Sequence, residues 1–273
     1  MADIAAHSGL SYFLYQEAFD KTPSAEKIQE LLEEHPEITH VSMVHSETTS
    51  GILNDIAAAA KAVKEAGRNF IVDAMSSFGG VDIPVEELGI DYIISSANKC
   101  IQGVPGFSFI ICIREELKKC EGQARSLSLD LYDQWKTMEK DGKWRFTSPT
   151  HVVLAFSQAL KEMEEEGGIP ARHARYAENN RILIEKMEEL GIRPYIEGPL
   201  QGPIITTFYY PEHAEFSFQE MYQYIKERGY AIYPGKVTDA DTFRIGNIGE
   251  IYPEDMERLA QIIRDFLNEK KEA

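Results

Sequence analysis

The chain has 273 residues, of which 43% are hydrophobic and 27% are charged, which is enough for one large domain or two unequal ones with buried cores. Its formal net charge is −17 at pH 7, and no cluster of lysines and arginines offsets the acidic excess, so we expect no nucleic-acid binding. No apolar run reaches the length of a membrane span, and the segment after Met1 lacks the basic and apolar regions of a signal peptide, so we expect no membrane partner.

The sequence contains three cysteines, Cys100, Cys112 and Cys120. Their odd number favours a reducing compartment, and we expect a cytoplasmic protein. Their spacing matches no metal site, so we expect no bound metal. Cys100 directly follows Lys99 and is either a reactive thiol or, as is more common for a free cysteine, a small buried residue.

In the first half of the chain, short apolar runs alternate with helical patterns. Ser24 is suited to cap a helix over 25–34. Alanines and other apolar residues at helical spacing predict a helix over 52–66 that ends at Gly67. The apolar runs predict strands over 40–45, 69–72, 91–94 and 107–113. Strands that alternate with helices predict a mostly parallel sheet.

Beyond Pro149 the sequence pattern changes to longer helical segments with a few short strands, and we expect a smaller α+β domain. The apolar spacing predicts helices over 149–166, 171–190, 217–228 and 253–269, and strands over 204–209 and 243–246. The whole chain therefore reads as an α/β protein with a large domain over 1–155 and a small C-terminal domain over 156–273.

Three polar segments, 45–49, 73–77 and 95–99, each follow an apolar strand. Because ligands gather at the carboxyl ends of parallel strands, this pattern predicts an active site. A lysine can hold pyridoxal phosphate (PLP) as a Schiff base while a carboxylate pairs with the ring nitrogen, and Lys99 and Asp73 are suited to these roles. The alternatives are a surface loop for Lys99 and a turn or helix cap for Asp73.

Small hydroxyls and one arginine are further candidates. Ser76 and Ser96 could donate to phosphate oxygens, and Thr48 could bond the cofactor, although such residues also serve turns and caps. Arg244 lies in a short apolar strand and needs an anion, either a substrate carboxylate or phosphonate or a structural acid. The segment 144–151 could form an anion site at the start of a helix, or only a helix cap.

Together, these motifs resemble those of the 2-aminoethylphosphonate–pyruvate transaminases, class V aminotransferases of PLP fold type I. The similarity lies in the Glu-Thr-Thr run within 45–53, the segment 72–79 and the Asn-Lys-Cys-Ile-Gln-Gly run within 96–103, and it continues through 146–151 and 243–249. It covers nearly the whole chain. It implies a PLP-dependent transfer of the amino group of 2-aminoethylphosphonate to pyruvate, giving phosphonoacetaldehyde and L-alanine in phosphonate catabolism.

The resemblance also implies a role for each site residue. Lys99 would hold the cofactor and move protons, and Asp73 would keep the ring nitrogen protonated. Arg244 would bind the acid group of the substrate. Further cofactor contacts are expected from Thr48, Ser76, Ser96, Thr147 and Trp144. The last two would act across the interface of a homodimer with shared active sites.

Members of the family begin well upstream of Met1. We therefore expect this chain to lack an N-terminal arm, a glycine-rich phosphate-binding turn and the residue that stacks on the cofactor ring. We expect the chain alone to bind PLP weakly and to transaminate poorly. Two other interpretations stay open: another class V aminotransferase, such as an alanine–glyoxylate or serine–pyruvate type, and a non-catalytic fragment that serves only as a subunit.

Overall fold

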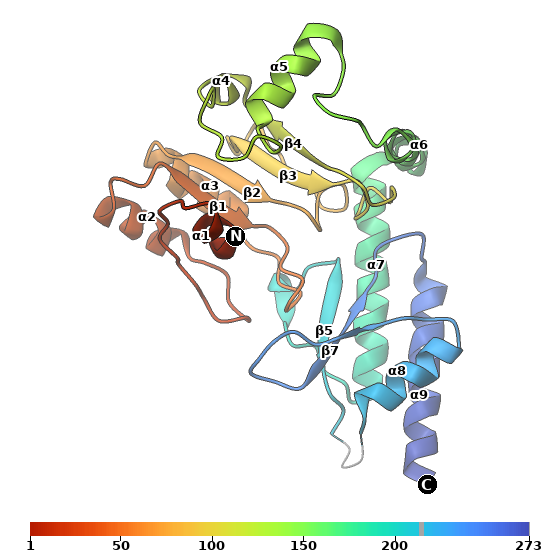
Figure 1. Ribbon diagram of the computed structural model, residues 1–273. Helices are drawn as coiled ribbons and strands as arrows, with labels where there is room; N and C mark the ends of the chain where they lie inside the picture. The colour runs from red at the N-terminus through yellow and green to blue at the C-terminus, as the bar shows by residue number, and fades with distance from the viewer. Residues whose placement is uncertain (213–215, 273) are drawn as a thin grey trace.

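The computed structural model describes residues 1–212 and 216–272. Figure 1 shows a four-stranded sheet in the first half of the chain, in the order β1-β2-β3-β4. Its strands are β1 (His40–Val44), β2 (Asn69–Asp73), β3 (Tyr92–Ser96) and β4 (Ser108–Cys112). The first three run parallel and β4 is antiparallel to β3, so the prediction of a mostly parallel sheet is confirmed.

Two helices, α2 (Ala25–Glu34) and α3 (Ile56–Glu65), pack on one face of this sheet. Strand residues two apart share a face, and Phe70 and Val72 of β2 are both fully buried in the same cluster as Val63 of α3. This alternation of buried and partly exposed residues determines which face of β2 meets the helices.

The start of α3 differs from the predicted helix over 52–66. Ile52 is extended because it forms an isolated β-bridge with Gln201 in the second half of the chain. The helix begins only after Asp55, whose Oδ1 accepts a hydrogen bond of 2.9 Å from the backbone N–H of Ala58. A long-range contact thus overrides the helical spacing of the first predicted turn.

The second half of the chain contains a three-stranded antiparallel sheet in the order β5-β7-β6. Phe208 and Phe243, on neighbouring strands, are fully buried, and their rings stack with centroids 5.7 Å apart. They belong to an apolar core that three helices complete. These elements are β5 (Ile205–Tyr209), β6 (Tyr233–Pro234), β7 (Thr242–Gly246), α7 (Gly168–Glu189), α8 (Phe218–Glu227) and α9 (Pro253–Glu272).

The helix α7 has 22 residues and runs from the edge of the first sheet to the core of the second (Figure 1). It begins at Gly168, earlier than the predicted start at 171, because Pro170 lies in the first turn, where its missing N–H would have no helical partner. The predicted domain boundary between 155 and 156 falls inside α6, and it stays a prediction.

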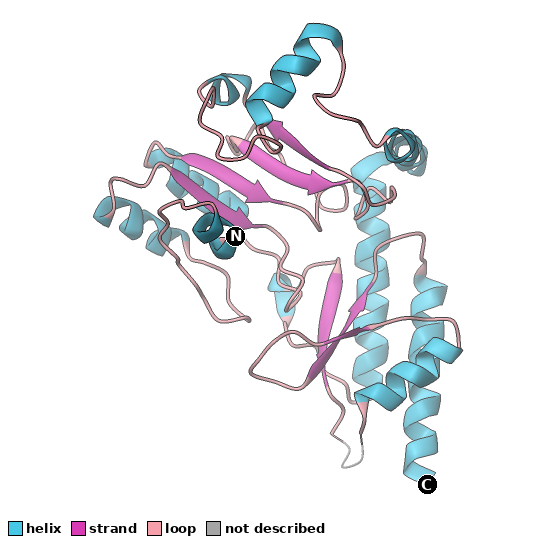
Figure 2. Ribbon diagram, viewed as in Figure 1, coloured by secondary structure: helices cyan, strands magenta, loops and turns pink. Residues whose placement is uncertain are grey.

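Figure 2 shows that loops join most of the remaining short elements. Within the described residues, no helix combines the length and apolar character needed to cross a membrane. The remaining elements are α1 (Ala2–His7), α4 (Arg114–Lys118), α5 (Leu131–Asp141), α6 (Thr150–Glu166) and the 3-10 helix η1 (Gly198–Leu200).

The cap of α3 provides a test of this fold. Asp55→Ala should lower the free energy of unfolding by about 1 kcal/mol, because a first-turn N–H loses its acceptor. Asp55→Asn, which keeps an oxygen acceptor, should stay close to the parent. Urea unfolding followed by far-UV circular dichroism measures both. Equal losses in the two variants would contradict the capping role.

Candidate active site

The register of the parallel strands brings three polar segments to one edge of the sheet. Val44 pairs with Asp73, and Asp73 pairs with Ile94. The backbone N–H of His45 donates to the carbonyl oxygen of Asp73, and that of Ala74 donates to the carbonyl oxygen of Ile94, both at 2.9 Å. The segments that carry Thr48, Asp73 and Lys99 in the sequence therefore leave the sheet side by side, as expected.

Serine side chains tie these segments together. Ser76 Oγ donates to the carbonyl oxygen of Ser46 at 2.9 Å, and Ser95 Oγ donates to that of Ala74 at 3.3 Å. The hydroxyl proton of Ser76 is thus already engaged, so the predicted phosphate contact of Ser76 requires an exchange of this bond. Its observed role is to join the loops after β1 and β2.

Unlike Ser76, Ser96 has a hydroxyl that is not engaged in a hydrogen bond within the described residues. Its side chain is 7% exposed, and its Oγ has no hydrogen-bond partner among the described residues. The same is true of the Oγ atoms of Ser46 and Ser50 in the neighbouring loop. Because a buried hydroxyl without a partner is costly, an acceptor-rich group such as a phosphate fits here.

Asp73 lies at the end of β2, and its Oδ1 accepts a hydrogen bond of 3.0 Å from the backbone N–H of Met75. Asp73 therefore does stabilise a turn, as one of the two interpretations expects. This hydrogen bond uses only Oδ1, so Oδ2 is available for other contacts. Lys99 lies in the turn after β3 and lines a cleft of about 790 Å³ together with Gln102, Arg172 and Tyr252. Within the described chain, the carboxylate of Asp73 does not line that cleft.

Arg244 reaches the same edge from the second sheet. Its side chain is buried on β7, where Nη1 donates to the carbonyl oxygen of Thr48 at 2.8 Å and Nε donates to that of Pro234 at 3.0 Å. Burial lowers the pKa of this guanidinium, against the opposing influence of Tyr233 and Glu47. In the part of the chain that the structure describes, no carboxylate lies within ion-pair distance of it, so the structural-acid alternative is not observed.

The two predicted residues before α6, Trp144 and Thr147, differ in their surroundings. Thr147 is exposed, and among the described residues its side chain forms no hydrogen bond with another candidate. Trp144 packs edge-on against Phe107, with ring centroids 6.0 Å apart, at the end of the loop that follows Lys99. The chain by itself therefore brings Trp144 near the lysine loop but does not bring Thr147 to Asp73.

His45 begins the polar segment 45–49, and only its burial in the structure distinguishes it from its neighbours. It is 5% exposed, and its Nδ1 lies 2.9 Å from Ser77 Oγ. Burial lowers the pKa of His45 to about 4, so the imidazole is neutral near pH 7. It supports the site as an uncharged hydrogen-bonding group.

Of the two interpretations of Cys100, a reactive thiol or a small buried residue, the structure shows the second. It is fully buried, and its Sγ donates to the carbonyl oxygen of Ser76 at 3.1 Å. Burial raises the pKa of the thiol to about 12, with smaller opposing contributions from Arg172 and Lys99. A thiol with such a pKa is a poor nucleophile, and we assign Cys100 to the packing of the site.

Comparison with known proteins agrees with this geometry. Residues 2–243 match the family model described as aminotransferase class-V. The chain is 57% identical over 258 residues to the 2-aminoethylphosphonate–pyruvate transaminase of Lysinibacillus sphaericus, covering 94% of this chain and 70% of that protein. It is 59% identical over 242 residues to a bifunctional phosphonoacetaldehyde hydrolase/aminoethylphosphonate transaminase of Clostridioides difficile, covering 88% of this chain and 38% of that protein.

The fold is similar to that of a solved alanine–glyoxylate aminotransferase from Nostoc sp. The TM-score is 0.87 at 22% sequence identity, and the match covers 97% of this chain and 71% of that one. At this identity the likeness concerns the fold alone.

The burial of His45 predicts a pH dependence of stability. The unfolded chain binds a proton at His45 with a pKa near 6.5, whereas the folded chain does so only near 4. As the pH falls from 6.5 to 4, the unfolded state gains more protons, so His45 should lower the free energy of unfolding by about 2–3 kcal/mol over this range.

The matched comparison is His45→Asn, which retains a hydrogen-bonding group but does not titrate. Its free energy of unfolding, measured by urea titration at several pH values, should fall less steeply between pH 6.5 and 4 than that of the parent. Parallel curves for the two proteins would show that His45 does not cause the pH dependence of the free energy of unfolding.

Proposed function

The chain belongs to the class-V aminotransferase family, and from this premise we propose that it transfers the amino group of 2-aminoethylphosphonate to pyruvate, giving phosphonoacetaldehyde and L-alanine. The family match confirms the predicted enzyme class, the PLP-dependent fold type I and pyridoxal phosphate as the cofactor. The relatives at 57% and 59% identity bear names with aminoethylphosphonate as the donor. These names support the phosphonate over an alanine–glyoxylate or serine–pyruvate reaction.

One observation carries the substrate proposal: a buried arginine at the edge of the site. Arg244 is 6% exposed and contacts the backbone of Thr48. A desolvated guanidinium needs an anion, and its planar fork matches a phosphonate or a carboxylate. Because Nε and Nη1 are each held by a carbonyl oxygen, Nη2 is the group proposed to bind the acid of the substrate.

Pyridoxal phosphate, when bound, supplies the electron sink for the reaction. We assign Lys99 to holding the cofactor through Nζ and to moving the proton at the substrate carbon that bears nitrogen. Asp73 would pair with the ring nitrogen and keep it protonated, since an anion beside a basic nitrogen favours its charged form. Ser96, whose Oγ has no partner in the described chain, would donate to the phosphate of the cofactor. Thr48 would contact the ring oxygen, and Ser76 would hold the loop that carries Ser46.

We further propose a homodimer in which Thr147 and Trp144 of one subunit complete the site of the other. Thr147 is exposed in its own chain. Nearby, Phe146 and Leu154 are 55% and 65% exposed, and such neighbouring apolar side chains favour a protein interface.

The cytoplasm is the proposed location of the enzyme. Cys100, Cys112 and Cys120 are all free in the described structure, which is the state that a reducing compartment maintains.

The role of Arg244 is tested by Arg244→Gln. The value of kcat/KM for 2-aminoethylphosphonate should fall about 100-fold or more, because truncating one partner of a buried charged pair costs about 2–5 kcal/mol. Arg193→Gln is the control, since Arg193 is exposed and stacks on the ring of Tyr209 in the same sheet, and it should retain the parent value. Equal activities of the two variants would exclude a role of Arg244 in binding the substrate. A parent enzyme that prefers L-serine or L-alanine as the amino donor would contradict the proposal of 2-aminoethylphosphonate.

The role of Lys99 is tested without substrate. Excess PLP followed by borohydride reduction and peptide mapping should place the reduced cofactor on Lys99, because only an amine in the site is held against the ring. Lys99→Arg keeps the charge and should lose this label. A label found mainly on another lysine of the parent would disprove the assignment.

A further inference from the structure

The loop after Lys99 has an unusual backbone. Gln102 adopts φ = 65°, the only positive φ among the non-glycine residues that the structure describes. Gly103 follows it, and a Cβ there would lie 2.6 Å from the carbonyl oxygen of Ala97. A left-handed non-glycine residue costs about 1–3 kcal/mol and persists only where its surroundings hold it. The contacts that hold this loop therefore bear on the position of Lys99.

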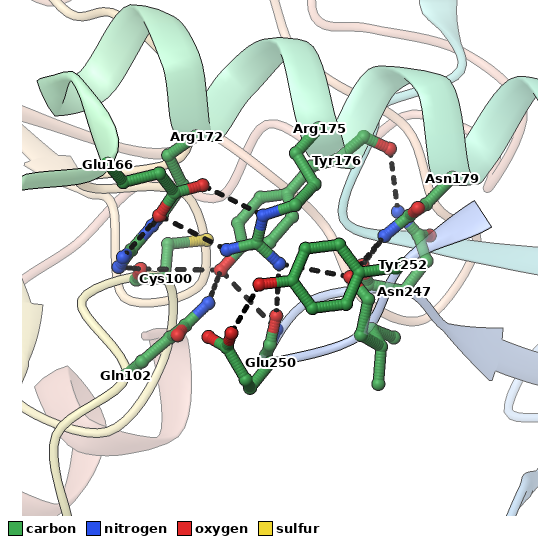
Figure 3. Close-up of polar contacts among 12 residues, drawn as sticks. Cys100, Gln102, Glu166, Arg172, Arg175, Tyr176, Asn179, Asn247, Glu250 and Tyr252 are labelled. Atoms are coloured by element: carbon green, nitrogen blue, oxygen red, sulfur yellow. Dashed lines mark hydrogen bonds and ion pairs between the residues drawn. The ribbon is translucent and has the colours of Figure 1, made fainter. Parts of the chain in front are cut away.

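A buried arginine from α7 holds the carbonyls of this loop. Arg172 is 2% exposed, and its Nη1 donates to the carbonyl oxygens of Cys100 at 2.8 Å and Ile101 at 3.3 Å. Figure 3 shows Arg172 reaching from the helix to the segment around Cys100. The two carbonyls belong to the residues directly after the lysine, so Arg172 restrains the backbone at the base of the Lys99 side chain.

Glu166 balances the charge of Arg172. Its Oε2 accepts from Nε of Arg172, and its Oε1 accepts from Nε of Arg175, each at 2.8 Å. Burial acts to raise the pKa of Glu166, but the hydrogen bonds from Arg175 and Arg172 prevail and lower it below its ordinary value. The carboxylate stays charged, so the buried guanidinium of Arg172 does not depend on a ligand for its anion.

Tyr176, one turn further along α7, holds the left-handed residue itself. Its side chain is fully buried, and its hydroxyl accepts from Gln102 Nε2 at 2.7 Å and donates to the carbonyl oxygen of Cys100 at 3.4 Å. The same hydroxyl accepts from the backbone N–H of Gly249 at 3.3 Å. One side chain thus joins the lysine loop to the segment that follows β7.

The segment after Arg244 is bound to the same turns of α7. Asn247 is fully buried, and its Nδ2 donates to the carbonyl oxygen of Tyr176 at 3.0 Å. Arg175 Nη1 donates to the carbonyl oxygen of Gly249 at 2.7 Å. Figure 3 shows Arg175, Tyr176 and Asn247 on one side of the helix. The start of α7 therefore contacts both the lysine loop and the segment that directly follows the strand of Arg244, the arginine that we assign to the substrate.

We propose that Arg172, charge-balanced by Glu166, is a positioning residue for Lys99, and that with Tyr176 it sets the lysine loop relative to the Arg244 strand. The inference rests on the proposed roles of Lys99 and Arg244. A catalytic group displaced by about 1 Å costs on the order of 100-fold in rate. Loss of Arg172 should therefore affect kcat far more than the binding of the amino donor.

The central variant is Arg172→Met, which keeps an unbranched apolar chain as far as the position of Nε, removes the guanidinium and leaves Glu166 paired with Arg175. Arg181→Met is the matched control, because Arg181 lies on the same helix and pairs with Glu178 and Glu185 but is exposed. Arg172→Lys is the conservative variant, since an ammonium keeps the charge but lacks the fork that serves a carboxylate and two carbonyls together.

Two readouts need no amino donor. Deuterium uptake by the peptide over 97–104 should be faster in Arg172→Met than in Arg181→Met. The visible circular dichroism of bound PLP, expressed per mole of cofactor trapped at Lys99, should be weaker, because the ring is held less uniformly. A change in global stability alone would not alter this ratio. Arg172→Lys should give intermediate values for both.

With the amino donor present, kcat of Arg172→Met should fall by about 100-fold while KM stays near the parent value, the pattern of a group that acts in the transition state. Uptake and dichroism equal to those of Arg181→Met would overturn the positioning role.

Should Arg172→Met fail to fold, Tyr176→Phe tests the same loop, since it keeps the buried ring and removes only the hydroxyl. It should shift both donor-free readouts in the same direction, and unchanged values in Tyr176→Phe and Arg172→Lys would likewise overturn the role. If the parent does not use 2-aminoethylphosphonate, the proposed function fails, yet the donor-free readouts still decide the role of Arg172.

Discussion

The site depends first on the parallel register of β1, β2 and β3. Val44, Asp73 and Ile94 lie at one level across the three strands, so three loops leave the sheet at the same edge. A slip of one residue would turn every side chain of a strand to the opposite face. It would move Phe70 and Val72, both fully buried, out of the core beneath α2 and α3. The apolar core thus holds Asp73 at the site, although Asp73 contributes little to that core.

Two buried arginines contact the site and differ in their partners. Arg172 is matched by Glu166, whereas Arg244 is held by carbonyl oxygens and meets no carboxylate in the described chain. Both guanidiniums lose most of their hydration, and each needs compensation. The first has its compensation within the fold, which suits a structural task. The second has it only in part, which suits a task that involves a ligand.

The sequence was sufficient to predict features with a local signal. Lys99, Asp73 and Arg244 are candidates from the sequence because each is a charged residue in or shortly after an apolar run, and their roles stay proposals. Features that depend on distant contacts were not found. Arg172 lies on a largely polar stretch of helix and acts on residues 71 and 72 positions away. In the same way, Ile52 has helical spacing but is extended by its bridge to Gln201.

The continuity of α7 has a mechanical consequence. Its first turns hold the backbone after Lys99, and its later residues Leu183 and Met187 are fully buried in the core with α9. A continuous helix of 22 residues moves largely as one rigid element. A displacement of the C-terminal core would therefore reach the lysine loop through α7, while the bond from Cys100 Sγ to the carbonyl oxygen of Ser76 ties the same loop to the first sheet. The lysine loop thus lies where the two halves of the molecule are joined, and a change in their relative position would act on it directly.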